Sequence, residues 1–269
     1  MKLDYGELIT DVYHVNDKEV KVSIPLTVPK LNDDIAEYIY KNFPRDEQFK
    51  ELAKYTKKDY YQKEVKAVGI WMSGGADSSL LSYCLAKLIK DHNLDIKLQP
   101  LSVRRGRPNN PIYAGNVIDF IEEDLDVKLN DHIVYYPPKD DSHYMEIEIF
   151  KEKDGEHFER DLFQVQYSGI TCNPPADDPS IPINKERTRD EDAERPLLTL
   201  NGFRFYMNPF FCINKRGLRQ IYDQLGLVDK LFPLTFSCEG SVEDTKTHTQ
   251  HCGKCWWCRE RYWAFGRYV

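Results

Sequence analysis

The heptapeptide Ser73-Gly74-Gly75-Ala76-Asp77-Ser78-Ser79 restricts the possible folds more than any other stretch of this chain. The apolar run that precedes it, from Ala67 to Met72, predicts a buried strand. After it, apolar residues recur at helical spacing on one face, at Leu80, Leu81, Cys84, Leu85, Leu88 and Ile89. The heptapeptide therefore predicts a tight turn from a buried strand into an amphipathic helix.

The composition of this turn suits an anion. Two adjacent glycines let the backbone turn tightly and approach a ligand closely. The N–H groups at the helix start and the helix dipole favour negative charge, and three serines add hydroxyl donors. We expect a pyrophosphate to contact Ser73, Gly74, Gly75, Ala76, Asp77, Ser78 and Ser79. The turn lacks the Lys of the Walker loop and the third glycine of the dinucleotide fingerprint. The plain alternative is a helix start capped by Ser or Asp.

Strands and helices alternate after this turn. Further strands are predicted at 96–103 and 132–136, with a helix between them that carries its apolar face from Val117 to Leu125. Such alternation is typical of a parallel sheet with helices on both faces, a three-layer α/β fold whose ligands bind beyond the carboxyl ends of the strands.

A basic, turn-rich loop follows the second of these strands at the same edge of the sheet. Arg104, Arg105 and Arg107 are candidates to face a phosphate or a carboxylate of the substrate. A solvated charge cluster explains the same residues equally well.

Residues 1–60 carry no recognisable chemistry and are interpreted as an N-terminal extension that packs on the core. The alternation at 19–25 predicts a strand. Helices are expected at 33–42 and 46–55.

The middle of the chain is less regular. Residues 144–166 are expected to be helical, and 167–175 to form a loop at the mouth of the pocket. The polar stretch 177–194 is interpreted as a mobile lid or a disordered insert. An Asn-Gly pair between two apolar runs predicts a hairpin over 197–207.

Lys215 is placed unusually. Asn214 is a good N-cap for a helix that carries Leu218, Ile221 and Tyr222, so Lys215 falls in the first turn, where the helix dipole disfavours a cation. A phosphate held nearby would explain the lysine. A solvent-exposed lysine is the alternative.

Four of the seven cysteines lie near the C-terminus, at Cys238, Cys252, Cys255 and Cys258. Pairs separated by two residues present two thiolates to one ion, and four soft ligands make a tetrahedral zinc site. A redox or sulfur-carrying cysteine pair and an iron–sulfur cluster are rivals. His248 or His251 replacing one cysteine is a further alternative.

Composition bounds the remaining possibilities. The chain has 269 residues, which suits a main domain at 61–235, the extension at 1–60 and a metal-binding segment at 236–269. A net charge of −7 argues weakly against a broad nucleic-acid face. The sequence contains neither a long apolar run nor a signal-peptide core, so a cytoplasmic protein is expected.

Ser-Gly-Gly-x-Asp-Ser resembles the PP-loop of the ATP pyrophosphatases. The whole series of motifs resembles 7-cyano-7-deazaguanine synthases: the loop, Asn214-Lys215, Phe236-Ser237-Cys238 and Cys252-Gly253-Lys254-Cys255-Trp256-Trp257-Cys258. Those enzymes usually have Tyr-Gly-Gln-Arg-His after the second strand, where this chain has Arg104-Arg105-Gly106-Arg107-Pro108, and a shorter gap before the last three cysteines.

The resemblance implies an ATP-dependent carbon–nitrogen ligase that converts 7-carboxy-7-deazaguanine to the nitrile with ammonia. It implies Mg²⁺ and a structural Zn²⁺ as cofactors, Asp77 and Lys215 as catalytic residues, and a possible homo-oligomer. Three alternatives remain: a tRNA-thiolating enzyme with the same ATP chemistry, an amidotransferase-like enzyme on another small substrate, and a non-catalytic nucleotide-binding module.

Overall fold

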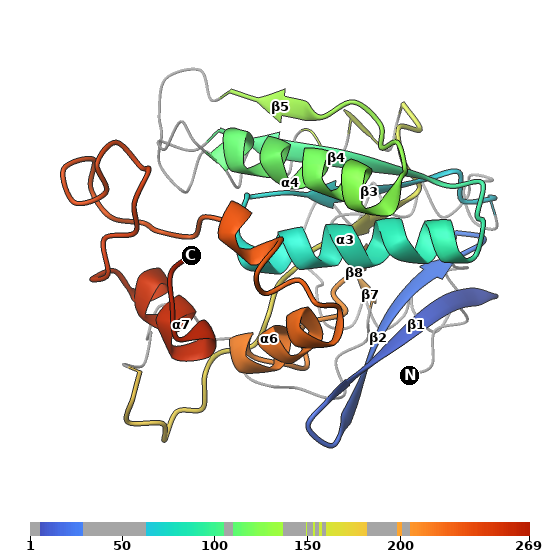
Figure 1. The fold of residues 1–269 in the computed structure, drawn as a ribbon. Coiled ribbons are helices and arrows are strands. Elements are labelled where there is room, and N and C mark those ends of the chain that lie inside the picture. The colour runs from blue at the N-terminus through green and yellow to red at the C-terminus, as the bar shows by residue number, and fades with distance from the viewer. Residues whose placement is uncertain are drawn as a thin grey trace, which may run out of the picture.

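The computed structural model describes residues 6–28, 63–104, 110–136, 160–181, 198–200 and 205–269, together with 149, 153, 156 and 157 (Figure 1). Its centre is a six-stranded sheet with the order β5-β4-β3-β6-β8-β7. The strands are β3 (Ala67–Trp71), β4 (Lys97–Val103), β5 (Ile133–Tyr135), β6 (Val165–Tyr167), β7 (Leu198–Leu200) and β8 (Phe205–Met207). All neighbours pair in parallel except β7 and β8, which form the expected antiparallel hairpin. The expectation of an α/β fold with a parallel sheet is therefore confirmed.

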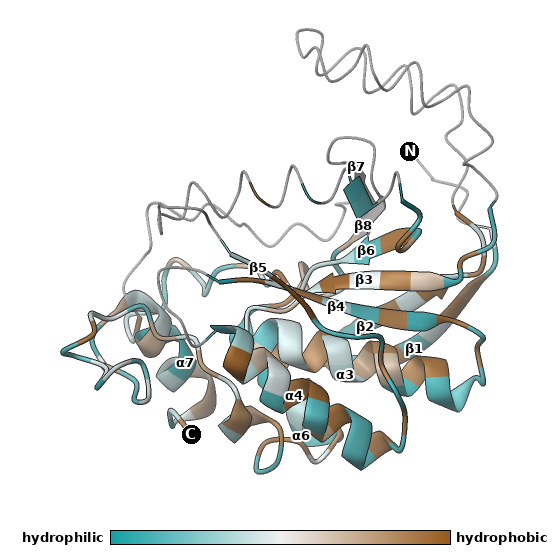
Figure 2. Cartoon of the chain, turned by 90° about the horizontal axis from the view of Figure 1, so that it is seen from above, coloured by the Kyte–Doolittle hydropathy of each residue, from teal (hydrophilic) through white to brown (hydrophobic). Residues whose placement is uncertain are grey.

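Two helices cover one face of this sheet, namely α3 (Ala76–Asp91) and α4 (Asn110–Leu125) (Figure 2). The apolar stripe of α3 is fully buried at Leu80, Leu81, Leu85 and Leu88, as its spacing predicted. The basic loop after the second strand was expected to run from Arg104 to Pro111. The helix α4 begins at Asn110, so this expectation was wrong for Asn110 and Pro111. Proline is tolerated in the first turn of a helix, where its missing N–H has no partner to lose. The prediction of helices on the second face as well is not tested by the described residues.

The chain order of the strands reverses beside β3. From β3 the chain moves through α3 to β4 and through α4 to β5, whereas β6 pairs with the opposite side of β3. In open parallel sheets a crevice forms at the carboxyl ends of the strands where the order reverses in this way. The Ser73–Ser79 loop follows β3 at that point, so the topology places it where ligands of such sheets bind.

Strand β6 corrects one prediction. Residues 144–166 were expected to be helical, but Val165 and Gln166 belong to β6, whose three residues are all buried. Most of 144–164 lies outside the described residues. β6 pairs with β3 on one side and β8 on the other. Pairing on both sides stabilises this strand although its three residues show only a weak strand pattern in the sequence.

The N-terminal extension forms a hairpin of β1 (Leu8–Val15) and β2 (Lys18–Pro25), of which only β2 was predicted. It packs against α3 and α6 (Lys215–Gln224), and Val20, Val22 and Ile24 are buried in the main core. A Cβ on Gly217 of α6 would lie 2.8 Å from Cγ1 of Val15, which shows how closely the hairpin approaches. The helices expected at 33–42 and 46–55 lie outside the described residues.

The C-terminal part consists of α6, a 3₁₀ turn at Phe232–Leu234 and α7 (Trp256–Phe265). Asn214 caps α6 as predicted, because its Oδ1 accepts hydrogen bonds from the N–H groups of Arg216 and Gly217. In the described part of the chain, every helix is too short or too polar to cross a bilayer.

We predict that Gly74→Ala lowers the free energy of unfolding by about 2–4 kcal/mol. Gly74 has φ +72°, and a Cβ there would stand 2.7 Å from Cβ of Tyr113 and 2.9 Å from O of Asn110. Gly115→Ala in α4 is the matched control, because its Cβ would meet nothing within 4 Å. It should stabilise by about 0.5–1 kcal/mol. Urea unfolding measures both, and equal stabilities of the two variants would contradict the described turn.

Candidate nucleotide site and metal centre

The Ser73–Ser79 loop leaves β3 and enters α3 without a side-chain cap. Gly74 adopts a left-handed conformation, and Gly75 is the N-cap residue. The first N–H groups of a helix lack intrahelical partners, and no side chain accepts from them at this cap. These groups therefore point toward the crevice with the positive end of a 16-residue helix behind them. This is an arrangement that can hold an anion.

The three serines of the loop differ in position. The hydroxyls of Ser73 and Ser78 lie 3.3 Å apart at the loop, and Ser73 is exposed. The Ser79 hydroxyl is fully buried and donates to O of Gly75 at 2.7 Å, which closes the first turn. Ser78 is also buried, and its hydroxyl donates to O of Gly75 at 3.3 Å. Ser73 is thus the hydroxyl most open to a ligand, Ser78 is the next, and Ser79 holds the loop in shape.

Segments distant in sequence form the walls around this loop. The N–H of Phe236 donates to O of Gly74 at 2.7 Å, and the Tyr222 hydroxyl donates to O of Ala76 at 2.8 Å. Gly169 follows β6, and a Cβ there would lie 2.7 Å from the backbone of Asp77, so only glycine fits. The predicted pocket-mouth loop thus does contact the start of α3.

Ser237 belongs to the Phe236-Ser237-Cys238 motif, and the sequence predicted no contact between its side chain and the Ser73–Ser79 loop. Its Oγ lies 3.3 Å from the place that a Cβ on Gly75 would take. Because the preceding residue bonds to Gly74, this hydroxyl lines the same loop. Sequence spacing offers no signal for such a contact, since more than 160 positions separate the two segments.

Lys215 contacts Asp77 across the site. Its Nζ lies 2.5 Å and 2.6 Å from the two carboxylate oxygens of Asp77, and 3.7 Å from Oε2 of Glu260 on α7. Three helices therefore meet at this ammonium. The alternative of a solvent-exposed lysine was wrong, because Lys215 is buried. Glu260 was missed, since a charged residue between Arg259 and Arg261 is typical of a solvated helix face.

The basic loop is described only at its first residue. Arg104 is exposed, its N–H donates to O of Tyr135, and its guanidinium carbon lies 5.9 Å from the centre of the Tyr136 ring. Arg105 and Arg107 lie outside the described residues. The assignment of these arginines to a substrate stays a prediction.

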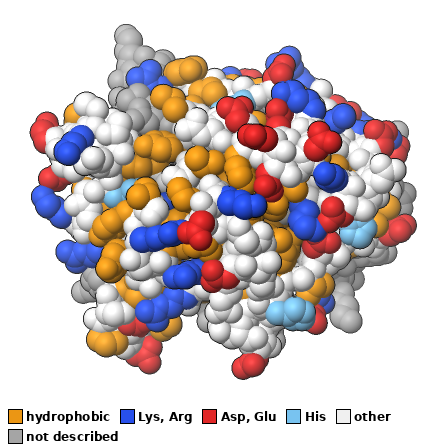
Figure 3. All heavy atoms as spheres, in the orientation of Figure 1, with side chains coloured by type: hydrophobic (Ala, Val, Ile, Leu, Met, Phe, Trp, Pro, Cys, Tyr) orange, Lys and Arg blue, Asp and Glu red, His pale blue; other side chains and the backbone are white. Residues whose placement is uncertain are grey.

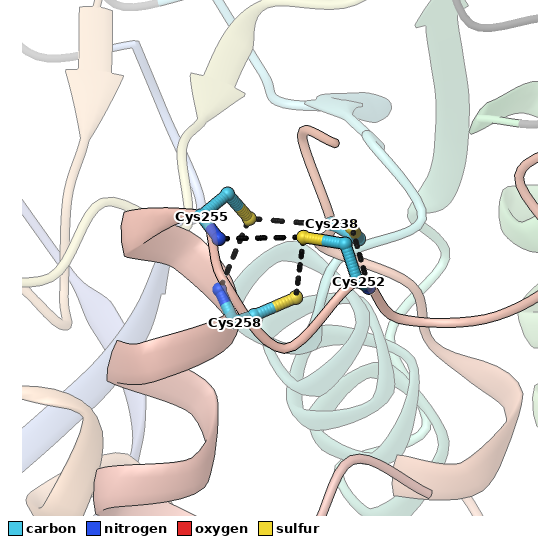
Figure 4. A group of neighbouring side chains, drawn as sticks. All are labelled: Cys238, Cys252, Cys255 and Cys258. Atoms are coloured by element: carbon cyan, nitrogen blue, oxygen red, sulfur yellow. Dashed lines mark hydrogen bonds between the residues drawn. The ribbon is translucent and has the colours of Figure 1, made fainter. Parts of the chain in front are cut away.

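The four predicted cysteines come together at the start of α7 (Figure 4). Their sulfur atoms all lie within 4.8 Å of one another, with 3.9 Å between Cys252 and Cys258 and 4.0 Å between Cys255 and Cys238. Disulfide sulfurs would be about 2.05 Å apart, so these are free thiols. Four sulfurs at the corners of a tetrahedron with bonds of ~2.3 Å lie ~3.8 Å apart. The cluster therefore fits a zinc ion.

Backbone N–H groups surround these sulfurs in a way that favours thiolates. Sγ of Cys238 accepts from the N–H groups of Gly240 and Cys252, and Sγ of Cys255 accepts from those of Glu239 and Cys258. The Cys258 thiol also donates to Sγ of Cys255, and this lowers the pKa of Cys255 to about 5. One thiolate thus forms readily, and a bound cation would favour loss of the other protons.

The two histidines near the cluster have other contacts. Nδ1 of His248 lies 3.1 Å from Oγ1 of Thr245, and the His251 ring packs 4.5 Å from that of Phe236. Burial lowers the pKa of His251 to about 3, which keeps it neutral. Within the described residues the group able to hold a metal consists of the four cysteines.

Arg261 connects the segment that carries the four cysteines to the Ser73–Ser79 loop. It is 1% exposed, and it donates to Oγ1 and O of Thr235, to O of Phe232 and to O of Tyr268. Burial lowers its pKa to about 10, so it stays charged at neutral pH. It fixes the turn that precedes Phe236, and Phe236 in turn bonds to Gly74.

A scan with protein-family models and a search of curated proteins each returned no match for the chain.

We predict that the purified protein carries one zinc ion per chain and that Cys255→Ser loses it. Because binding of a structural zinc is coupled to folding, the variant should also unfold at a lower temperature. Cys212→Ser is the control, because this half-buried thiol lies outside the cluster. Elemental analysis gives the metal content. Equal zinc in both variants, or the absorption bands of an iron–sulfur cluster, would refute the zinc assignment.

Proposed function

We propose that this chain is an ATP-dependent carbon–nitrogen ligase that releases AMP and pyrophosphate. Its substrate would be a carboxylate or amide of a small heterocycle, with 7-carboxy-7-deazaguanine and ammonia as the reactants and the nitrile as the product. The observation that carries the proposal is the uncapped start of α3 beside Gly74, with the buried ammonium of Lys215 reaching Asp77. The uncapped N–H groups and the ammonium of Lys215, which is paired with Asp77, lie there at the switch point of a parallel sheet.

Each residue has a role that follows from its position. The N–H groups of Ala76, Asp77 and Ser78 and the hydroxyls of Ser73 and Ser78 would bind the departing pyrophosphate, while the N–H of Gly75 donates to Oγ of Ser73. Lys215 would neutralise phosphate charge as it develops, which is the main contribution a protein makes to such a transfer. The side chain of Asp77 is 19% exposed, so it can bind the Mg²⁺ that accompanies the phosphates or keep the loop in its conformation.

The reaction overcomes a poor leaving group. A carboxylate oxygen of the substrate attacks the α-phosphorus of ATP, the bond to the bridging oxygen breaks, and pyrophosphate leaves. Ammonia then attacks the acyl carbon and AMP leaves, which gives the amide with loss of a proton. For the nitrile, the amide oxygen attacks the α-phosphorus of a second ATP and pyrophosphate leaves. AMP then leaves with that oxygen, and the nitrogen loses its two protons as the carbon–nitrogen triple bond forms. The loop would serve both steps by aligning the phosphates.

Two metal ions accompany this proposal. Oxygen ligands suit Mg²⁺, so Asp77 is the residue that would hold it, and bound Mg²⁺ would neutralise phosphate charge. Zn²⁺ would be held by Cys238, Cys252, Cys255 and Cys258 and would stabilise the fold around the loop.

A small substrate is favoured over a polynucleotide by the charge of the surface. The chain has a net charge of −7. On the face drawn in Figure 3, acidic and basic side chains are interspersed and do not form one basic field. A tRNA-thiolating enzyme would need an extended positive surface for the phosphate backbone.

We predict that Asp77→Asn lowers kcat by roughly 100-fold or more while the protein still folds, because a charge that aligns the phosphates is lost. Asp119→Asn on the exposed side of α4 is the matched control and should keep full activity. Chromatography of the nucleotides and mass spectrometry of the deazapurine follow the reaction. ADP in place of AMP would exclude the proposed chemistry. Salt-sensitive binding of tRNA, with turnover of no free deazapurine acid, would favour the thiolating enzyme.

A further inference from the structure

Lys215 lies between two carboxylates whose surroundings differ. The side chain of Asp77 is 19% exposed and belongs to the first turn of α3, whereas that of Glu260 is 0% exposed and belongs to α7. The ammonium contacts both oxygens of Asp77 and lies 3.7 Å from the nearer oxygen of Glu260. One cation is thus shared by an accessible anion and an inaccessible one.

The position of Glu260 is fixed by the metal segment. Cys255 is the N-cap of α7 and Cys258 is fully buried in the cysteine cluster, so the helix cannot rotate without moving two sulfurs. In the orientation that these sulfurs fix, Arg259 faces solvent and Glu260 faces the interior. Burying a carboxylate costs several kcal/mol unless a cation accompanies it. The ammonium of Lys215, 3.7 Å from Oε2 of Glu260, is a cation that partly offsets the burial of this carboxylate.

We propose that Glu260 is a positioning residue that keeps Lys215 paired when Asp77 turns to a divalent cation. The proposal rests on the function proposed above, in which ATP binds with Mg²⁺ at the loop. Lys215 loses its contacts with Asp77 when that carboxylate binds Mg²⁺. Glu260 then remains as a counter-charge within a short movement of the ammonium, which stays directed at the phosphates. Asp77 can leave the ion pair because Glu260 also supplies Lys215 with a negative counter-charge.

The proposal separates two kinds of binding. Without the charge of Glu260, Lys215 pairs with Asp77 only, and this tighter pair competes with Mg²⁺ for the carboxylate. When ATP binds without Mg²⁺, Asp77 can stay paired with Lys215. Loss of the negative charge of Glu260 also favours binding of the negatively charged ATP. Replacing Glu260 with an uncharged residue should therefore weaken only the part of the ATP affinity that Mg²⁺ contributes.

Isothermal titration calorimetry with ATP, once with EDTA and once with Mg²⁺, tests this directly. The quantity of interest is the Kd with EDTA divided by the Kd with Mg²⁺. We expect Glu260→Gln to lower this ratio about tenfold, with a Kd in EDTA that is unchanged or smaller. Arg259→Gln, one position away on the exposed face of α7, is the matched control and should keep the wild-type ratio.

Zinc content and circular dichroism show whether each variant is folded. If Glu260→Gln does not fold, Glu260→Asp keeps the charge but shortens its reach, and it should lower the ratio by less. Equal weakening in both titrations would mean a merely structural role and would overturn the proposal, as would a wild-type ratio in a folded variant. If the wild type binds ATP in neither titration, the proposed function fails as well.

Discussion

The ion pair between Asp77 and Lys215 is the contact on which the arrangement of this site depends. It joins the first turn of α3 to the first turn of α6, two elements 138 positions apart in sequence. Both carry a charge at a helix start, where the dipole favours the carboxylate and disfavours the ammonium. The pair places an ammonium and its carboxylate partner at the start of α3, beside N–H groups that no side chain caps.

The cysteine cluster supports this pair through two connections. The chain runs from Phe236, which bonds to Gly74, directly to Cys238. The helix α7, whose N-cap is Cys255, carries both Glu260 beside Lys215 and Arg261 beside the turn at Phe232–Thr235. A metal that holds these cysteines would therefore hold the Ser73–Ser79 loop as well. This explains in physical terms why a loop and a metal segment so far apart in sequence belong to one site.

Local patterns predicted the loop, the cap at Asn214 and the four cysteines, because each of these depends on neighbours in the chain. Long-range packing decided the rest. Strand β6 has three residues and is set by partners on both sides, and the first strand of the N-terminal hairpin has only a weak alternation. The burial of Glu260 depends on the rotation of α7, which the sulfurs fix. Arg105, Arg107 and the polar stretch beyond residue 181 lie outside the described residues, so their predicted roles stay predictions.

Transfer of isotopically labelled oxygen tests the central claim, which is that the loop serves adenylation of a carboxylate. The substrate acid would be labelled with ¹⁸O in its carboxyl group and incubated with ATP, Mg²⁺ and ammonia. The account predicts one labelled oxygen in the phosphate of AMP, seen by mass spectrometry, because that oxygen attacks the α-phosphorus. Formation of the nitrile together with unlabelled AMP, or label in inorganic phosphate, would contradict it.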